Sequence, residues 1–231
     1  MSKHPGSRKT RSQSASEPDD VFVARVLHLG KWAEANQQVL TVLIVVAAIL
    51  MAGLVYYRNY RSSLNVQAAQ QLELVYQTAS IQDMEGAVNE LTTFLERFSG
   101  TAYEGEARLV LGEIYLRDGR SEQAQAVLEP LGSSPRRPIE LQGASLLAAA
   151  YEQVGRQQEA EQIYLTIASR SDLDFQVRNA LAAAARIRSD RGDVAGAIQL
   201  FERAIEGLEE DSPQRGLYEM RIAELRAGTN A

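Results

Sequence analysis

The sequence predicts an all-α protein in which one membrane-spanning helix precedes an array of paired helices. Three observations predict this class. Residues Val39–Tyr57 contain no charged side chain. Alanines recur further along the chain at spacings of 37, 36 and 37 residues. Extended alternating runs and Asn-Gly turns, which mark strands and hairpins, are absent.

The chain begins with a polar tail. Residues 1–20 are rich in Ser and charged side chains and nearly devoid of apolar ones, so we expect a disordered basic tail. Residues 21–38 follow as a juxtamembrane amphipathic segment, in which Phe22, Val26 and Leu29 share one helical face. That face fits a helix lying along a membrane surface. A helix packed on no particular surface fits the same pattern equally well.

Residues 39–57 form the predicted transmembrane helix. Nineteen residues at helical rise cover about 28 Å, close to the thickness of a bilayer's hydrocarbon core. The run starts too late and is too long for a signal peptide. A buried helix of a soluble core is the alternative, and the length favours the anchor. Aromatic and basic residues typical of a membrane interface flank the run: Lys31, Trp32, Tyr56, Tyr57, Arg58, Tyr60 and Arg61.

Charge is divided unevenly along the chain. Residues 1–38 carry a net charge of +2, which leaves −8 for the remainder of a chain of net charge −6. The basic side of a span usually stays in the cytoplasm, so we expect a cytoplasmic N-terminus and an exported C-terminal domain, although close to the span the two sides carry equal numbers of basic residues. An acidic domain disfavours nucleic acid as a partner. The chain has no cysteine, which excludes disulfides and thiolate metal sites.

Residues 58–231 form the predicted repeat domain. The recurring alanines are each followed four residues later by a large side chain, and the last three are preceded by a glycine five residues earlier. One unit contains Leu111-Gly112-x2-Tyr115, which resembles the tetratricopeptide repeat. The residues concerned are Ala87, Ala124, Ala160 and Ala197, with Gly119, Gly155 and Gly192.

This repeat pattern has a physical reading. The alanine lies where two helices cross, the glycine permits a left-handed turn, and each pair covers the apolar face of the next. The first unit, near residues 68–99, departs from the pattern because Gln82 replaces the turn glycine. The spacing exceeds the usual 34, so we expect extra residues in the connections, where Pro135, Pro138 and 172–174 fall. An unrelated helical bundle is the alternative fold.

A final helix is predicted after residues 211–213. Tyr218, Ile222 and Leu225 form one stripe, Pro213 suits a helix start and Gly228 suits a helix end. We expect this helix to cap the array.

An enzyme is not predicted. Past residue 61 the chain has no His, Cys, Lys or Trp, which excludes from the main domain the ordinary acid–base and nucleophilic schemes that use His or Cys. The neighbouring carboxylates Glu159 and Glu161, and those of residues 209–211, are interpreted as solvated faces. We therefore expect no catalytic residue, no cofactor, no metal site and no small-molecule substrate.

Several short motifs resemble one known family. They are Lys31-Trp32-Ala33-Glu34-Ala35-Asn36 with Tyr57-x2-Tyr60, then Thr101-Ala102-Tyr103-x3-Ala107-x3-Leu111-Gly112, and finally Ser212-Pro213 with Met220-Arg221-Ile222-Ala223-Glu224-Leu225. From about Leu29 to Leu225 the chain resembles the ancillary subunits of the bacterial Sec translocon. It departs in having one Trp where the family often has two, and in its longer basic tail.

The resemblance implies a location and partners. Members of that family are single-pass inner-membrane proteins with periplasmic tetratricopeptide repeats. It implies association with the Sec translocon, with periplasmic chaperones and with emerging secreted chains, and a bilayer around the span. A structural scaffold for another cell-envelope complex, such as a division or outer-membrane assembly machine, is the alternative function.

A protein-binding groove is predicted on the first helix of each repeat. If Tyr115 and Tyr151 face the second helix, the other face lines a concave surface with mixed charges and apolar patches. Such a surface favours an extended or helical partner segment over a charged chain terminus. The groove residues are Leu109, Glu113 and Leu116; Ser145, Ala149 and Glu152; and Ala182, Arg186 and Ser189.

Overall fold

A computed structural model describes residues 36–80 and 84–228, and all regular secondary structure in these ranges is helical. The chain divides into two compact units, Met1–Tyr60 and Arg61–Ala231. Predictions for the tail, for most of segment 21–38 and for Lys31, Trp32 and Gln82 concern residues outside the described ranges.

Helix α2 runs from Gln37 to Ser80 and contributes to both units. Within its first half the apolar side chains are exposed, among them Val42, Ile44, Ile49 and Leu50. Among the described residues one helix, Gln37–Gln77, is long and apolar enough to cross a membrane, and none of its most apolar window is buried. The helix continues past Arg61, as the absence of Pro and Gly between Gly53 and Gly86 permits.

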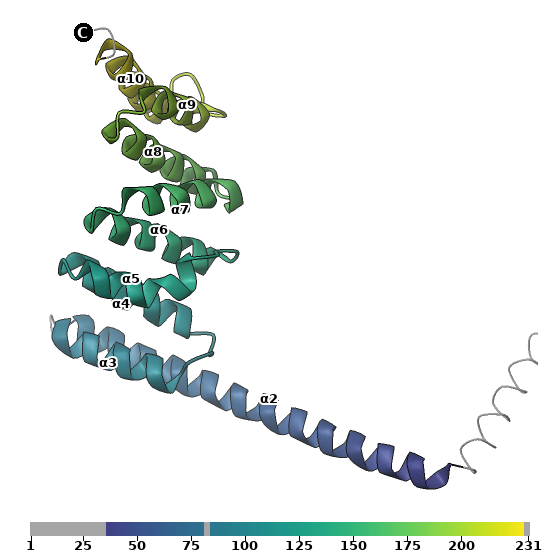
Figure 1. The fold of residues 1–231 in the computed structure, drawn as a ribbon. Coiled ribbons are helices and arrows are strands. Elements are labelled where there is room, and N and C mark those ends of the chain that lie inside the picture. The colour runs from purple at the N-terminus through teal and green to yellow at the C-terminus, as the bar shows by residue number, and fades with distance from the viewer. Residues whose placement is uncertain (1–35, 81–83, 229–231) are drawn as a thin grey trace, which may run out of the picture. The chain divides into compact units, whose positions relative to one another are not determined.

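The second unit stacks helices in sequence order (Figure 1). Each helix packs mainly on its neighbours along the chain, with α4 also contacting α6 directly. Pairs such as α4 with α5, α6 with α7 and α8 with α9 correspond to the predicted repeats. The helices are α3 Met84–Arg97, α4 Glu104–Arg117, α5 Ser121–Gly132, α6 Pro138–Gln153, α7 Gln157–Arg170, α8 Asp174–Asp190, α9 Val194–Ile205 and α10 Pro213–Gly228.

The predicted helix-crossing alanines are confirmed. Ala87, Ala124, Ala160 and Ala197 are all completely buried. Close packing also requires Gly112 of α4, because a Cβ built there would lie 2.6 Å from the side chain of Leu128 in α5. The two helices of this repeat therefore approach more closely than any side chain larger than hydrogen would permit.

The predicted left-handed glycine turns are also confirmed. Gly119, Gly155 and Gly192 have φ values of 72°, 78° and 83°. At the first turn Gly119 N–H donates to the Leu116 carbonyl at 3.2 Å and Arg120 N–H donates to the Tyr115 carbonyl at 2.8 Å. This pair of bonds ends the helix with the carbonyls of its last turn satisfied. The other two turns repeat it.

Pro135, Asp172 and Leu173 lie in the connections between repeats, as predicted. Residues 133–137 join α5 to α6, and residues 171–173 join α7 to α8. Pro138 and Asp174 begin helices instead of lying in linkers. Proline suits that position because its fixed φ matches the first helical turn and its missing N–H has no partner there.

The terminal helix begins at Pro213 and ends at Gly228, as predicted. Tyr218 and Ile222 are buried against α9, where the ring of Tyr218 lies 6.0 Å from that of Phe201. Leu225 is half-buried in the same cluster.

Candidate protein-binding surface

The predicted groove residues lie on the first helices of three repeats, α4, α6 and α8, but not all are accessible. Leu109 is only 9% exposed and belongs to the core, and Leu116 packs against that core. Placing Leu109 on an open face was wrong, because α4 is packed against α3, α5 and α6 and has less free surface than an isolated pair. Glu113 is exposed.

An ionic contact joins α6 to α8. The Arg186 guanidinium donates to the Glu152 carboxylate and lies 3.7 Å from that of Asp190. The Tyr164 hydroxyl donates to Glu152 Oε1 at 2.9 Å. Burial, followed by the charge of Glu152, raises the pKa of Tyr164. The structure thus places Glu152 and Arg186, which sequence reasoning assigned to separate repeats, on one surface.

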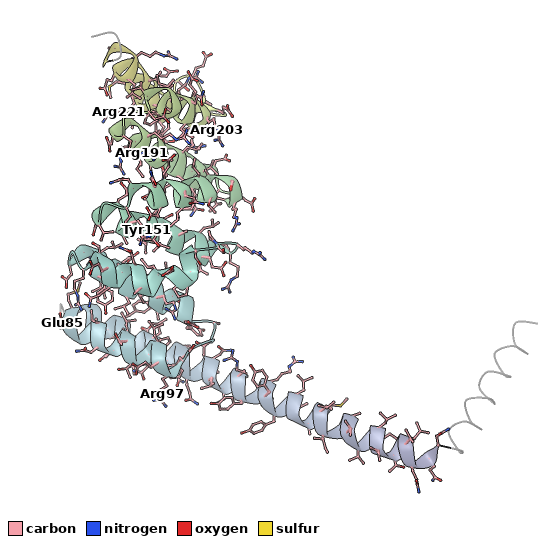
Figure 2. The ribbon with its side chains drawn as sticks, viewed as in Figure 1. Glu85, Arg97, Tyr151, Arg191, Arg203 and Arg221 are labelled. Atoms are coloured by element: carbon pink, nitrogen blue, oxygen red, sulfur yellow. The ribbon has the colours of Figure 1, made fainter. Side chains whose placement is uncertain are left out.

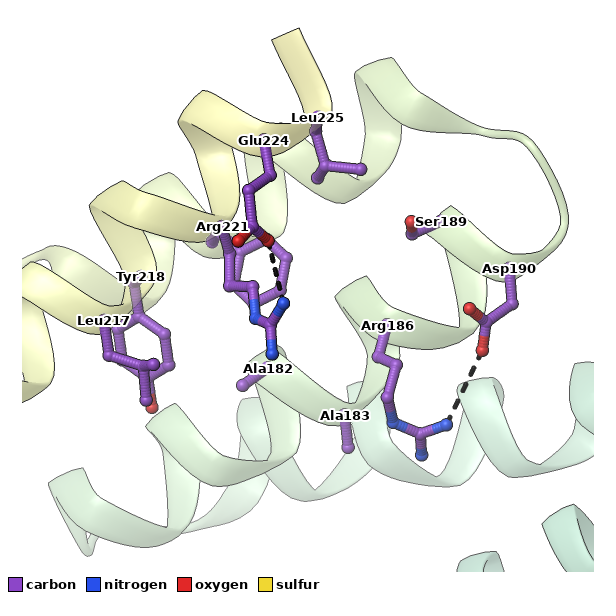
Figure 3. A pocket seen from close by; sticks show the side chains of 11 residues that line it. Ala182, Ala183, Arg186, Ser189, Asp190, Leu217, Tyr218, Arg221, Glu224 and Leu225 are labelled. Atoms are coloured by element: carbon purple, nitrogen blue, oxygen red, sulfur yellow. Dashed lines mark hydrogen bonds and ion pairs between the residues drawn. The ribbon is translucent and has the colours of Figure 1, made fainter. Parts of the chain in front are cut away.

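A hollow lies between α8 and α10 on this surface (Figure 3). Its volume is about 570 Å³, and the predicted residues Ala182, Arg186 and Ser189 line its α8 side. A second hollow is lined by Ser145 of α6 and shares Ala183 of α8 with the first. Together the two hollows form an accessible strip along α8. The centre of this strip carries the small side chains of Ala182 and Ala183.

Sequence reasoning missed the contribution of α10 to this strip. Leu217, Arg221, Glu224 and Leu225 line the large hollow from the opposite side. Leu217 is 49% exposed, and Arg221 pairs with Glu224 at 2.8 Å, as Figure 3 shows. The available signal was Leu217, an apolar residue outside the buried stripe of a helix interpreted only as a cap.

An acidic region at α2 and α4 was also missed. The Tyr76 hydroxyl donates to Glu106 Oε1 at 2.6 Å. Burial and this bond raise the pKa of Tyr76, and the nearby charges of Glu113 and Glu73 raise it further. The groove prediction included Glu113 but gave no reason to expect carboxylates from two helices around one tyrosine.

The predicted membrane-interface residues fall in different environments. Tyr56, Tyr57 and Tyr60 are more than half exposed, and the rings of Tyr56 and Tyr60 are stacked at 6.5 Å. Arg58 is exposed as well. Arg61, in the second unit, donates to the Gly100 carbonyl at 2.7 Å. This last contact fixes the loop between α3 and α4 onto α2.

Of the carboxylates at 159 and 161, only Glu159 is solvated. Glu161 is 9% exposed and lies 2.6 Å from both Arg188 Nε and Arg191 Nη1. Arg191, which follows α8, is labelled in Figure 2. Interpreting Glu161 as solvated was wrong, because the following repeat covers this part of α7. Glu159 is nearly half exposed and pairs with Arg156. Among residues 36–80 and 84–228, no group of three or more His, Cys, Asp or Glu is arranged to hold a metal ion.

Comparison with protein families supports the repeat assignment. A family model described as a tetratricopeptide repeat-like domain matches residues 30–138. A second, described as a tetratricopeptide repeat, matches residues 180–215. No curated protein matches the chain.

Solved structures share the fold at low identity. The nearly identical TPR-like repeats of a Podosopora anserina kinesin light chain match with a TM-score of 0.56 and 20% identity, over 71% of this chain and 87% of the other. A tetratricopeptide repeat protein from Parabacteroides merdae matches with a TM-score of 0.58 and 18% identity, over 71% of this chain and 61% of the other.

Geometry and comparisons agree on the architecture. The paired helices, the left-handed glycine turns and the buried crossing alanines are the features that the repeat pattern requires. The chain therefore carries tetratricopeptide-repeat-like domains, which generally act as non-enzymatic scaffolds for protein–protein interaction.

Proposed function

We propose that this protein is a membrane-anchored adaptor, an ancillary subunit of the bacterial Sec translocon whose periplasmic repeats bind chaperones or emerging secreted chains. One observation carries the proposal: an exposed apolar helix and the repeat domain occur in one chain, and the match to a tetratricopeptide repeat-like domain begins at residue 30, before that helix. An anchor holds the repeats at a membrane, where their partners pass.

The surface along α6, α8 and α10 is the proposed binding face. It combines apolar side chains with charges that are already paired, Arg186 with Glu152 and Arg221 with Glu224. A charged chain terminus would have to break one of these pairs on binding. A segment that presents apolar side chains keeps both pairs and fills the hollows, so it is the better occupant.

Photocrosslinking in cells tests the partners. A photoreactive residue is placed at Ser145, Ala182 or Ser189 of the binding face, with matched controls at the exposed positions Glu122 and Gln162 of the second helices. Translocon subunits, chaperones or secreted chains should be captured from the binding face and not from the controls. Equal capture from both sets would reject the face. Capture of division or outer-membrane assembly proteins alone would reject the translocon and favour the scaffold.

A reporter tests the topology separately. An enzyme that is active only outside the cytoplasm, fused after Ala231, should be active, because the basic tail is expected to stay inside. Replacing Val45 and Val46 with Arg should release the chain from membranes, since each mid-span charge costs about 2.5–3.5 kcal/mol on insertion. Reporter activity confined to the cytoplasm would contradict the periplasmic placement.

A further inference from the structure

The four connections between consecutive repeats differ in charge. They join α3 to α4, α5 to α6, α7 to α8 and α9 to α10, and they lie along one edge of the repeat domain, opposite the glycine turns (Figure 1). Counted from the last residue of one helix to the first of the next, they carry net charges of 0, +2, −1 and −4 in chain order. The edge is therefore basic at the second connection and strongly acidic at the fourth.

The first connection is held at the start of the repeat domain. Arg61 donates to the Gly100 carbonyl at 2.7 Å, and Ala102 N–H donates to Asn65 Oδ1 at 3.0 Å. Arg61 follows Tyr57, the last residue of the predicted span, by four residues, which is about 6 Å along a helix. A connection bound to Arg61 therefore lies at the level where the hydrocarbon core ends and lipid headgroups begin.

The second connection, residues 133–137, borders the first. Gly100 and Arg137 line the same hollow of about 380 Å³. Arg136 is exposed, and in the described part of the chain its guanidinium has no ion-pair partner. The pair between Arg137 and Glu140 is weak because the arginine side chain is 72% exposed, and Glu140 also accepts from the backbone N–H groups of both arginines. Both guanidinium groups are therefore accessible to an anion.

The charges around the first connection cancel. Glu96 is exposed beside Arg97, and Arg108 pairs with Glu104 at 2.8 Å. The positive charge near the span consequently comes from Arg61 and from the two arginines of the second connection.

An anionic bilayer surface fits this end of the edge. Residues 98–103 and 133–137 contain no carboxylate, and Ser133 and Ser134 add exposed hydroxyl groups beside the arginines. Guanidinium groups bind phosphate through two hydrogen bonds at once, and basic residues next to a span are attracted to anionic headgroups. A span brings lipid phosphates to the level of Arg61 without further recruitment, so a bilayer is a better occupant than a dissolved anion or an acidic protein.

We propose that the first two connections of the repeat domain rest on anionic lipid headgroups of the leaflet from which α2 emerges, bound by Arg136 and Arg137 beside Arg61. The acidic fourth connection is repelled by the same surface and stays away from it. This contact rests on the membrane anchor of the proposed function and is independent of the Sec translocon and of the binding face along α6, α8 and α10.

Headgroup quenching in nanodiscs tests the contact with the full chain, because the native chain has no cysteine to compete with a label. A fluorophore is attached at Ser134→Cys in the second connection, at Glu122→Cys on the opposite edge, or at Gln214→Cys beside the fourth connection. Discs contain phosphatidylcholine alone or mixed with phosphatidylglycerol, and a fraction of the headgroups carries a quencher. Quenching at Ser134→Cys should rise with phosphatidylglycerol and fall with added salt, while the other two labels stay bright.

Two results of the quenching experiment overturn the proposal. One is equal quenching at Ser134→Cys and Glu122→Cys, and the other is quenching at Ser134→Cys that does not depend on phosphatidylglycerol. A chain that does not enter the discs would instead reject the membrane anchor, and this contact with it.

Charge variants test the arginine directly. Arg136→Gln should lower the ratio of bound to unbound connections about fivefold in anionic discs, the contribution of one arginine near such a surface, and Arg136→Lys should keep it. Arg117→Gln is the matched control, because Arg117 is exposed near the opposite edge and has no ion pair in the described part of the chain. Unchanged quenching in Arg136→Gln, or an equal loss in Arg117→Gln, overturns the proposal. Circular dichroism confirms that the variants keep their helix content.

Discussion

The guanidinium of Arg120 lies 4.6 Å from the ring centre of Tyr115, across the glycine turn that joins α4 to α5. Arg156 and Tyr151 form the same contact at 4.4 Å in the next repeat. In the following repeat Arg188 stands at the tyrosine position, and Asp193 at the arginine position. There Asp193 accepts from Gly196 N–H at 2.9 Å. Two turns thus use a cation–π contact where the third has an ion pair, with Arg188 Nε 3.9 Å from Asp193 Oδ2.

The contact between Arg120 and Tyr115 should be measurable as a coupling energy. Tyr115 is 9% exposed and the Arg120 side chain 28%, so the contact is partly desolvated and should contribute about 1 kcal/mol. A double-mutant cycle with Tyr115→Leu and Arg120→Met, followed by denaturant unfolding, measures it. Strictly additive effects would show that the two residues act independently.

Ala160 should not tolerate a larger side chain. It is completely buried where α7 crosses α6, and overpacking of this kind costs about 1–3 kcal/mol. Ala160→Leu should therefore lower the melting temperature of the full chain in detergent. Glu159→Ala, one residue earlier on an exposed position, is the matched control and should leave the melting temperature unchanged. Equal, negligible effects would mean that the repeat register is wrong.

Glu161 should be the most sensitive carboxylate in the repeat domain. Its buried side chain accepts from Arg188 and Arg191, both at 2.6 Å, and a bond between charged groups contributes about 1.5–3 kcal/mol. Glu161→Gln should lower the free energy of unfolding by about that amount. Glu159→Gln removes an exposed ion pair and should have no measurable effect. A Glu161→Gln chain as stable as the original would show that the arginines are solvated instead.

Because of Glu140, the free energy of unfolding should depend on pH. Its carboxylate accepts from the backbone N–H groups of Arg136 and Arg137 at 2.8 and 3.0 Å. These bonds and that from the Arg137 side chain lower the pKa of Glu140 from 4.5 to about 2. The stabilisation is therefore fully present above pH 4.5 and is lost as the pH falls toward 2.

The variant Glu140→Gln isolates this effect. It should melt at a lower temperature than the original chain at pH 7, and the difference should shrink between pH 4.5 and 2. Melting curves recorded across that range provide the measurement. If the difference in melting temperature stayed constant down to pH 2, the loss of stability in the variant would come from the geometry of the amide group and not from the missing charge.

The repeat architecture was predictable because local chemistry specifies it. A left-handed turn favours glycine, as at Gly119, and a close helix crossing favours alanine, as at Ala160. Both residue types therefore recur at the repeat spacing and can be recognised in the sequence. The accessible surface was less predictable. Leu109 and Glu161 became buried through contacts with other helices, and nothing in their own helix distinguishes a position covered by the next repeat from one open to solvent.

The same reasoning explains why the role predicted for α10 was incomplete. Its buried stripe predicted a helix packed on α9, and that packing is present. The hollow opposite α8 depends on the distance between two helices that are not consecutive, which periodicity does not encode. Leu217 therefore entered the surface only when the structure placed it there.

Because nearly every helix contact in the repeat domain is between consecutive helices, the domain has no central core whose loss would dissolve the whole. A substitution that weakens the interface between two consecutive helices should therefore have a local effect. The helices on the terminal side of that interface should unfold, while the helices on its other side stay folded. Helix α10 is held through α9 and is the first to be lost in this way. A ligand that contacts both α8 and α10 would stabilise the docked position of α10. Hydrogen exchange of the α10 backbone amides should therefore slow when the partner binds.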